Sequence, residues 1–394
     1  MPPTPDESTG GLSVLVVNYN TTALTRRCVA SLHAQKLSFF DGVRSRIEVI
    51  VVDNASRTEE QAALAGINAT IVYSNDNHGY GAALNHALKV ANGEYILFSN
   101  SDTWYFPNAL QALLDWFRQL PRCGAVGPRL WWDYDRAFLL PPSDPVTPMR
   151  YIRDAAVRAN LWWHQQSERH WRQQALRYWK VQEPLVQPML SGACILTHKN
   201  VLTACGGFDE LFRLYYEDTD WCRRVRQKGY RLYYIPEADV AHFYNQSGRQ
   251  DVMEVQRIGR ESEARYFQKH YGVWSWNALS WVAMKLEACD TQAERITEYV
   301  DLGLCGTSPE FWFSPKGTTT YLWQLSPSPL CVPAIARFVS KPEDLVISPQ
   351  VWAQLGPGEF FARLFTLPDL RLVQQWRWQK SSSELRNRDI SSVA

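Results

Sequence analysis

Short apolar runs alternate with stretches of helical periodicity over the first 120 residues of the chain. Residues 47–53 are an example of a predicted strand, because five of these seven residues are Val or Ile. The predicted strands are residues 12–18, 47–53, 70–74 and 95–99, and the predicted helices are residues 22–35, 56–64, 81–91 and one that Pro107 opens. Strands that alternate with helices favour an α/β fold, in which βαβ units build a twisted, mostly parallel sheet with flanking helices.

Polar residues follow each of the four predicted strands. Ligands of open α/β sheets bind outside the carboxyl ends of the strands, so four polar strand ends predict a nucleotide-binding crevice. The alternative for any single strand is that Asn, Asp and Ser favour turns. The first strand is not followed by a glycine-rich loop, which argues against a dinucleotide oxidoreductase and a sugar-nucleotide pyrophosphorylase. The four strand ends are Asn18-Tyr19-Asn20, Asp53-Asn54-Ala55-Ser56, Asn75-Asp76-Asn77 and Asn100-Ser101-Asp102.

Residues 137–185 interrupt this pattern. A proline-rich stretch leads into a helical segment with several tryptophans, and residues 150–183 carry an excess of Arg and Lys over Asp and Glu. One hypothesis is a helical insertion that packs on the sheet and covers the acceptor side. The other is a basic helix that lies on an anionic membrane surface.

The C-terminal part has a different composition. Residues 250–300 are predicted to be helices that close the catalytic domain, which spans residues 11–300. Short runs separated by turn signals over residues 306–380 predict a small β-sandwich, loosely similar to a fibronectin type III module. Residues 1–10 and the tail 381–394 are expected to be disordered.

Composition excludes several other classes of protein. The 41 basic and 40 acidic residues leave a net charge of +1, which does not favour nucleic acid as a partner. The eight cysteines are scattered without a Cys-x-x-Cys pair, a pattern typical of reduced thiols in a cytoplasmic protein. The chain contains no run of about 18 apolar residues, and its N-terminus has no signal-peptide pattern.

Carboxylates gather at one predicted helix start. A helix is expected to begin near Asp218 and to end near Gly229, with Glu217, Asp218 and Asp220 at its N-terminus. Capping needs only one acid, so we expect Asp218 to be a general base and Asp220 to be closer to a capping residue. Asp102 is the expected ligand of Mn²⁺ or Mg²⁺, which would neutralise a diphosphate leaving group. His242 is either a further metal ligand or a structural residue.

The ordered set of motifs resembles the family 2 glycosyltransferases of the GT-A fold, a Rossmann-like α/β architecture, over about residues 12–270. The nearest subgroups in this resemblance are rhamnosyltransferase-like and galactofuranosyltransferase-like enzymes. The motifs are Asn18-Tyr19-Asn20, Asp53-Asn54-Ala55-Ser56, Asn77-His78-Gly79-Tyr80-Gly81 with Asn85, Asn100-Ser101-Asp102, Ser191-Gly192-Ala193, Gly206-Gly207-Phe208-Asp209-Glu210 and Glu217-Asp218.

The resemblance implies an inverting, single transfer from a UDP- or dTDP-sugar to a glycan or lipid-linked acceptor during synthesis of a surface polysaccharide such as O-antigen. It implies peripheral contact with the inner membrane, and a homodimer is a further candidate assembly. By motif position, Asp218 is the base, Asp102 and His242 bind the metal, and Glu217, Trp131 and Gly192 contact the acceptor. The residues implied to bind the donor nucleotide are Val17, Tyr19, Asp53, Asn77, Gly79, Asn100 and Ser101.

Two further features of the sequence bear on this interpretation, a departure from the family's metal motif and a match to a motif of other enzymes. Asn100 replaces the first aspartate of the Asp-x-Asp metal motif and removes one negative charge. Residues 374–378 match the Gln-x-x-Arg-Trp motif of processive synthases, but no membrane helices accompany it, which favours a single-addition enzyme. The alternative function is a catalytically silent protein on the same fold that binds glycans or nucleotide sugars.

Overall fold

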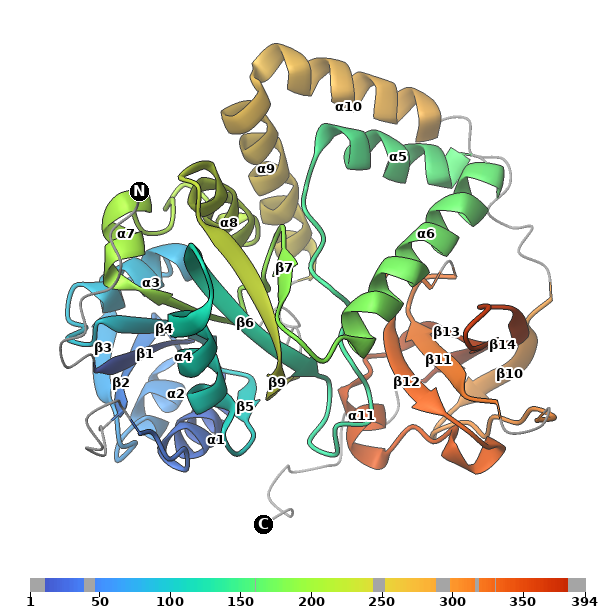
Figure 1. Cartoon of the computed structure of the whole chain (residues 1–394), viewed down its shortest axis with the longest axis horizontal. Helices are drawn as coiled ribbons and strands as arrows, with labels where there is room; N and C mark the ends of the chain where they lie inside the picture. Colours follow the sequence, from blue (N-terminus) through green and yellow to red (C-terminus); the bar gives the residue numbers. More distant parts are fainter. Residues whose placement is uncertain are drawn as a thin grey trace. The chain divides into compact units, whose positions relative to one another are not determined.

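The computed structural model describes residues 11–38, 47–159, 161–243, 252–287, 298–315, 319–329 and 331–381 (Figure 1). These residues form two compact units. The first unit contains the residues up to 131, from 142 to 151 and from 177 to 282. The second contains residues 132 to 141, 152 to 176 and those from 283 onwards. The expected disorder of residues 1–10 and 381–394 concerns residues that, apart from Ser381, lie outside the described ranges.

A mixed sheet of nine strands forms the centre of the first unit in the part of the chain that the structure describes. The strand order is β3-β2-β1-β4-β8-β6-β9-β5, and β7 pairs with β9. Strands β3, β2, β1 and β4 are parallel to one another, whereas β8 is antiparallel to β4 and β6. The strands are β1 (Leu12–Asn18), β2 (Ile47–Asn54), β3 (Thr70–Ser74), β4 (Tyr95–Asn100), β5 (Thr103–Tyr105), β6 (Cys123–Trp131), β7 (Leu185–Gln187), β8 (Cys194–His198) and β9 (Arg231–His242).

The register brings the polar strand ends together at one edge. Asn18 at the end of β1 pairs with Asp53 on β2, and Val17 pairs with Asn100 on β4. The predicted α/β class with a mostly parallel sheet is confirmed. The predicted position of the four strand ends at a common edge is therefore also confirmed for β1, β2 and β4.

Helices cover both faces of this sheet. Cys28 on α1 lies against Ser99 on one face, and Phe117 on α4 packs against Tyr95 on that face. The opposite face carries α3 and α8. The helices are α1 (Thr22–His33), α2 (Thr58–Ala63), α3 (Tyr80–Leu88), α4 (Ala109–Gln119), α5 (Pro148–Ala159), α6 (Leu161–Lys180), α7 (Lys199–Cys205), α8 (Glu217–Gln227), α9 (Val252–Tyr271), α10 (Val273–Glu287) and α11 (Pro349–Gln354).

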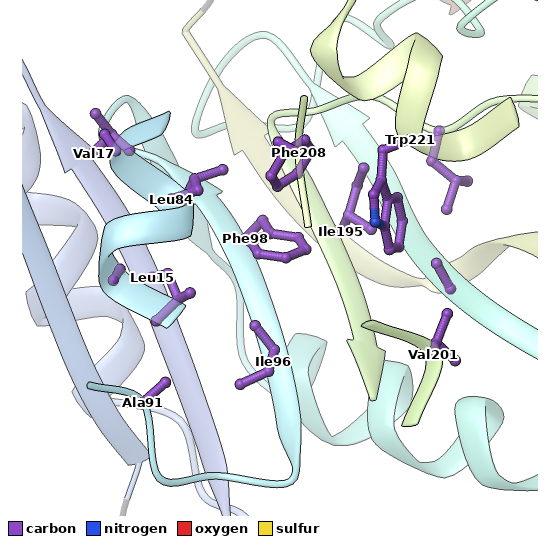
Figure 2. Close-up of a cluster of buried hydrophobic side chains, with 14 of the residues drawn as sticks. Leu15, Val17, Leu84, Ala91, Ile96, Phe98, Ile195, Val201, Phe208 and Trp221 are labelled. Carbon is purple, nitrogen blue, oxygen red and sulfur yellow. The ribbon is translucent and has the colours of Figure 1, made fainter. Parts of the chain in front are cut away.

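The core under α8 fixes the start of that helix. Figure 2 shows Trp221 reaching from α8 towards Ile195, with Phe208 above Phe98. The rings of Phe98 and Phe208 meet edge to face at 4.8 Å, and Trp221 lies 6.0 Å from both. Trp221 is fully buried, and its Nε1 donates to the Gly206 carbonyl at 3.1 Å. Because a buried tryptophan anchors the first turn of α8, the carboxylates beside it have a fixed position.

The second unit contains a separate sheet with the order β10-β14-β13-β11-β12. The predicted β-rich C-terminal region is confirmed, but its five described strands belong to one sheet and not to the two facing sheets of a sandwich. Residues 345–347 lie outside the strands, and the segment from Pro349 forms α11. The strands are β10 (Val300–Cys305), β11 (Tyr321–Ser326), β12 (Ile335–Val339), β13 (Gly358–Thr366) and β14 (Leu372–Lys380), and a 3₁₀ turn spans Pro342–Asp344.

Side chains cover both faces of this second sheet, which explains why no second sheet is needed. On one face, Trp323 packs with Phe311 and Trp376. On the other, Gln324 accepts a hydrogen bond from Arg172 of α6 at 2.8 Å. A helix that buries one face of a sheet replaces the facing sheet of a sandwich.

The tryptophan-rich segment packs on both sheets. Glu168 of α6 pairs with Arg363 of β13, so this part of α6 lies on the C-terminal sheet, whereas the ring of Tyr178 near its end lies 3.9 Å from the ring of Tyr234 on β9. That the segment covers the acceptor side stays a prediction. Trp171 and Trp179 are buried, so these two rings are not available to a membrane. Trp162 and Trp163 lie outside the residues whose side chains are described. No helix among the described residues is long and apolar enough to cross a membrane.

Candidate active site

A buried amide holds the end of β1. Asn18 is fully buried, and its Nδ2 donates to Asp53 Oδ1 at 2.8 Å and to Ser56 Oγ at 3.1 Å. Its Oδ1 accepts from Thr25 Oγ1 at 2.7 Å. Asp53 Oδ2 accepts from the Ser56 backbone N–H at 3.1 Å and from Gln61 Nε2 at 2.9 Å. The Asp53 carboxylate, which the sequence assigns to the nucleotide, is thus already fixed by donors from three residues.

The remaining strand-end residues surround this network. Val17 lies in the register beside Asn100, and Ser101 Oγ lies 2.9 Å from Thr21 Oγ1. Tyr19 follows directly after the buried Asn18 and is half-buried. The predicted nucleotide residues of β1, β2 and β4 therefore lie at one edge.

The loop before α3 is closed by side-chain amides. Asn54 Nδ2 donates to Asn77 Oδ1 at 2.9 Å, and the Gly79 N–H donates to the same oxygen at 3.0 Å. Gly79 has a φ of 96°, and a Cβ at this position would lie 2.2 Å from the Arg213 carbonyl oxygen. Only glycine fits there, because it tolerates positive φ and lacks a Cβ. Asn77 and Gly79 thus shape the loop beside the end of β2.

Three side chains meet where β4 and β9 end. His242 Nε2 lies 3.3 Å from Asp102 Oδ1 and 3.3 Å from Asn100 Nδ2. Asp102 and His242 are both buried. The Asp102 carbonyl accepts the Phe243 N–H at 3.0 Å, and Thr103 pairs with His242, so backbone pairing of β5 and β9 sets their positions. The structure brings together the two residues predicted to bind metal.

The donor set at this position suits Mn²⁺ or Mg²⁺. Among the residues that the structure describes, no group of three or more His, Cys, Asp or Glu side chains could surround an ion. One carboxylate and one imidazole are nonetheless enough when phosphate oxygens and water complete the coordination. The imidazole favours Mn²⁺-type ions. Asp102 and His242 therefore fit a cation that binds together with a diphosphate.

Asp218, at the start of α8, is held by backbone donors. The Gly192 N–H donates to Asp218 Oδ2 at 2.9 Å, and the Thr219 N–H donates to Oδ1 at 2.7 Å. A Cβ on Gly192 would lie 2.8 Å from Asp218 Oδ2, so the absence of a side chain permits this approach. Burial raises the pKa of Asp218, whereas these N–H donors oppose the rise.

Glu217 is more isolated than its neighbour. Its side chain is buried, and Oε2 has no hydrogen-bond partner among the described residues. Burial and the adjacent Asp218 raise the pKa of Glu217 to about 8. A carboxyl group in this environment holds a proton near neutral pH, which makes it a hydrogen-bond donor.

Asp220, two residues further along α8, is fully engaged. It accepts from Arg224 Nε at 2.8 Å and pairs with His270 Nε2 at 2.8 Å and Lys269 Nζ at 2.7 Å. Hydrogen bonds from these three side chains keep the pKa of Asp220 well below its usual range despite its burial. Asp220 ties α8 to α9, so its role is structural.

The segment before β8 connects the metal side to the acid side. The Asn100 N–H donates to the Ala193 carbonyl at 3.0 Å, while the neighbouring Gly192 holds Asp218. Tyr80 OH donates to the Gly192 carbonyl at 3.1 Å. Burial raises the pKa of Tyr80, and the charges of Glu217, Asp218 and Asp102 raise it further. All three acids therefore lie close enough to act on one phenol.

The family follows from the sequence match. Residues 13–201 match the family model described as glycosyl transferase family 2. The part of the chain from residue 13 to residue 201 is therefore a family 2 glycosyltransferase domain. Asp102 and Gly192 lie within the matched residues, whereas Glu217, Asp218 and His242 follow them.

Two curated relatives are similar to this chain. The N-acetylglucosaminyl-diphospho-decaprenol L-rhamnosyltransferase of Mycobacterium tuberculosis is 25% identical over 285 residues, which cover 67% of this chain and 86% of the relative. The O-antigen biosynthesis protein RfbC of Myxococcus xanthus is 26% identical over 254 residues, which cover 63% of this chain and 18% of the relative.

Two solved structures overlap with the chain in part. The mannosyltransferase PcManGT of Pyrobaculum calidifontis, in complex with GDP-Man and Mn²⁺, has a TM-score of 0.42 and 18% identity, covering 74% of this chain and 79% of that one. GalNAc-T7 with UDP, GalNAc and Mn²⁺ has a TM-score of 0.44 and 15% identity, covering 74% and 57%.

Within the family 2 glycosyltransferase domain, two aromatic residues need comment. Trp131, predicted to contact the acceptor, pairs in register with Ala241 beside His242, and its Nε1 donates to Asp239 Oδ1 at 2.7 Å. Tyr80 was not assigned a role from the sequence, although it stands inside the quoted Asn77 to Gly81 motif. The only feature of the sequence that points to a functional role for Tyr80 is its position between Gly79 and Gly81.

Proposed function

We propose that the chain transfers one sugar from a UDP- or dTDP-sugar to a hydroxyl of a lipid-linked or glycan acceptor, with inversion at the anomeric carbon and with the help of a divalent cation. The single observation that carries this proposal is the segment at Gly192 and Ala193. It contacts Asp218 through one residue and Asn100 of the metal motif through the next. A base and a diphosphate site at one edge are what such a transfer requires.

Asp218 is the group that takes the proton. As the acceptor oxygen forms its bond to the anomeric carbon, its proton moves to the Asp218 carboxylate, and the bond from that carbon to the diphosphate breaks with its electron pair on the diphosphate. Attack from the face opposite the diphosphate inverts the configuration. The N–H groups of Gly192 and Thr219 keep the base oriented, and burial makes the carboxylate more basic.

Asp102 and His242 would hold Mn²⁺ or Mg²⁺ beside Asn100. When bound, such an ion neutralises the charge that develops on the leaving diphosphate. Asn100 in place of an aspartate leaves only one carboxylate in this set, so the diphosphate itself supplies much of the affinity for the ion.

The acceptor class is supported by the relatives. The mycobacterial relative is named for a sugar linked through a diphosphate to decaprenol, and the Myxococcus relative for O-antigen synthesis. We therefore favour a polyprenol-linked acceptor in the synthesis of a surface polysaccharide. The silent binding protein is less favoured, because a protein that only binds has no need for the two adjacent buried acids Glu217 and Asp218.

Contact with a membrane fits such an acceptor. Trp274, Trp281 and Met284 of α10 are 87%, 58% and 55% exposed, and their spacing places them on one face of the helix. Exposed tryptophans on one helix face are typical of helices that lie in the membrane interface. The expected homodimer stays a prediction.

A thermal-shift screen of nucleotide sugars, with Mn²⁺ and with EDTA, tests the proposed function. One UDP- or dTDP-sugar should raise the Tm, and EDTA or Asp102→Ala should remove most of the increase. Glu59→Ala, an exposed acid on α2, serves as the control and should respond like the wild type. Stabilisation that is equal with EDTA and in Asp102→Ala would refute the metal-assisted binding of the donor.

A further inference from the structure

A surface hollow of about 350 Å³ lies between the turn before α8 and the first half of α9. It is lined by Tyr215, Tyr216, Gln256, Gly259, Arg260 and Glu263. Tyr216 directly precedes Glu217, and its carbonyl accepts the Asp220 N–H at 2.8 Å as the first helical bond of α8. One wall of the hollow is therefore formed by the residue that precedes the acid pair in the chain, and the volume of the hollow is in the range of small-molecule sites.

The turn that forms one wall has an unusual backbone. Tyr215 and Tyr216 have φ values of 63° and 68°, in the left-handed region. Two bulky residues in succession rarely adopt this conformation, and backbone strain of this kind clusters at ligand sites. Tyr216 is fixed by its OH, which donates to Glu263 Oε1 at 2.9 Å, while Tyr215 stays 42% exposed. The strained turn thus leaves the ring of Tyr215 partly exposed next to the start of α8.

Gly259 forms the floor of the hollow inside α9. Glycine in a helix interior costs about 1 kcal/mol relative to alanine, so its presence asks for a reason. A Cβ at Gly259 would have the Tyr215 ring as its nearest neighbour, at 3.4 Å. The backbone itself tolerates a side chain there, but a large side chain would fill the space under the ring.

One residue of the hollow, Arg260, offers a positive charge to an anionic ligand. Arg260 has no ion-pair partner among the described residues, whereas Arg257, one turn earlier, pairs with Glu254 and Glu261. The Arg260 guanidinium beside the exposed Tyr215 ring suits a sugar that carries a phosphate group. The ring can stack on the sugar, and the N–H groups of the guanidinium can bind phosphate oxygens.

We propose that this hollow is the subsite for the sugar-diphosphate head of the acceptor, where Tyr215 stacks on the sugar and Arg260 binds the diphosphate. This inference rests on the proposed function. It names the part of the chain that selects an acceptor linked through a diphosphate over the same sugar without one.

The test uses two probes on the full chain: N-acetylglucosaminyl diphosphate with a short isoprenoid, and the octyl glycoside of N-acetylglucosamine. Binding is measured by calorimetry without donor. The wild type should bind the diphosphate probe more tightly, and Arg260→Gln should weaken that binding about ten- to hundredfold while leaving the octyl glycoside unchanged. Arg257→Gln is the matched control and should bind both probes like the wild type.

Gly259→Leu gives a second readout that unfolding does not imitate. Leucine favours the helix more than glycine does, so the fold should be kept or stabilised. The variant should nonetheless bind both probes at least tenfold more weakly, because the side chain fills the hollow. Unchanged binding in both variants, or a wild type that does not distinguish the two probes, would overturn this inference. Donor binding in the thermal-shift screen would be unaffected by that outcome, so the proposed function is judged separately.

Discussion

Two groups of buried polar residues at the edge of the first sheet differ in how completely they are hydrogen-bonded. At the ends of β1 and β2, Asn18 and Asp53 satisfy one another and their neighbours. At the start of α8, one buried oxygen of Glu217 has no hydrogen-bond partner among the described residues. Asp218 accepts from two backbone N–H groups and from the Thr219 hydroxyl, and no described cation pairs with it. A satisfied network stabilises the fold, whereas under-partnered carboxylates keep a raised pKa that suits proton transfer.

The same contrast occurs within one turn of α8. Asp218 has a raised pKa, whereas the pKa of Asp220 lies well below its usual range because Arg224, Lys269 and His270 surround it. Burial alone therefore does not determine the role of an acid. The hydrogen-bond and ion-pair partners of each acid determine its role. Substitution of Asp218 should therefore affect catalysis, whereas substitution of Asp220 should affect stability.

The largest effect is expected at Asp218. Asp218→Asn should lower kcat by about 10³-fold or more, because a general base contributes up to about 10⁴-fold. Donor binding in the thermal-shift screen should persist, since the amide keeps the size of the side chain. Single-turnover transfer assays measure the loss, and a rate near that of the wild type would remove Asp218 from the mechanism.

Asp220→Asn should show the opposite pattern. Loss of a fully buried acid that pairs with Arg224 and Lys269 and contacts His270 should reduce the free energy of unfolding by about 3 kcal/mol. A carboxyl with a lowered pKa stabilises the fold above its unfolded pKa, so the deficit should be complete at pH 7. It should begin to shrink only below a pH of about 4, and it disappears at the folded pKa, which lies well below that value. Urea unfolding measures it. A large fall in kcat with unchanged stability would break the comparison between the two acids.

Glu217→Gln should change the pH dependence of stability. The pKa of Glu217 is about 8 in the folded chain and near 4.5 when unfolded, so the folded state binds the extra proton between these values. Wild-type stability should therefore fall as the pH rises from about 4.5 to 8, and the variant should become more stable relative to it by about 1 kcal/mol or more.

The measurement for this variant is Tm of the metal-free protein from pH 5 to pH 9. Glu59→Gln, on the exposed surface of α2, is the control and should follow the wild type. If the difference between Glu217→Gln and the wild type did not change with pH, the carboxyl group would not carry the raised pKa.

Buried and exposed tryptophans differ in the same way as the two groups of polar residues, and the smallest effect is expected from substitution of an exposed tryptophan. Trp171 of α6 is buried, while Trp274 and Trp281 of α10 are exposed. Trp274→Ser should weaken binding to vesicles with anionic lipid about fivefold, because the ring no longer enters the interface. Trp312→Ser, 69% exposed in the second unit, should bind like the wild type. Equal binding by both variants, or a change in oligomeric state instead, would argue against α10 as the membrane contact.

Much of the first unit was predictable, because its strands and helices carry strong local patterns. Residues 70–74 were predicted and observed as a strand with the same bounds, and the start of α8 was predicted to within one residue. The strand-end motifs also placed Asp102 and Asn100 correctly, since the parallel register forces strand ends to one edge.

The C-terminal prediction failed where long-range packing decides. The alternating runs in residues 306–380 specify strands, but nothing local shows that α6 covers one face of the sheet through Arg172 and Glu168. Tyr80 and the contact of Gly192 with Asp218 are similar cases in the site, although Gly192 itself was predicted to contact the acceptor. Their importance comes from contacts with Asp218 and with the Gly192 carbonyl, which a single sequence does not display.

The most direct test of the account is a crystal structure with Mn²⁺ and the nucleoside diphosphate that the thermal-shift screen selects. Anomalous scattering locates the ion without reference to any expectation. We expect it at the Asp102 carboxylate and His242 Nε2, with the diphosphate in the same cavity as Asp218. An ion bound elsewhere, or a diphosphate separated from Asp218 by the body of the sheet, would contradict the account.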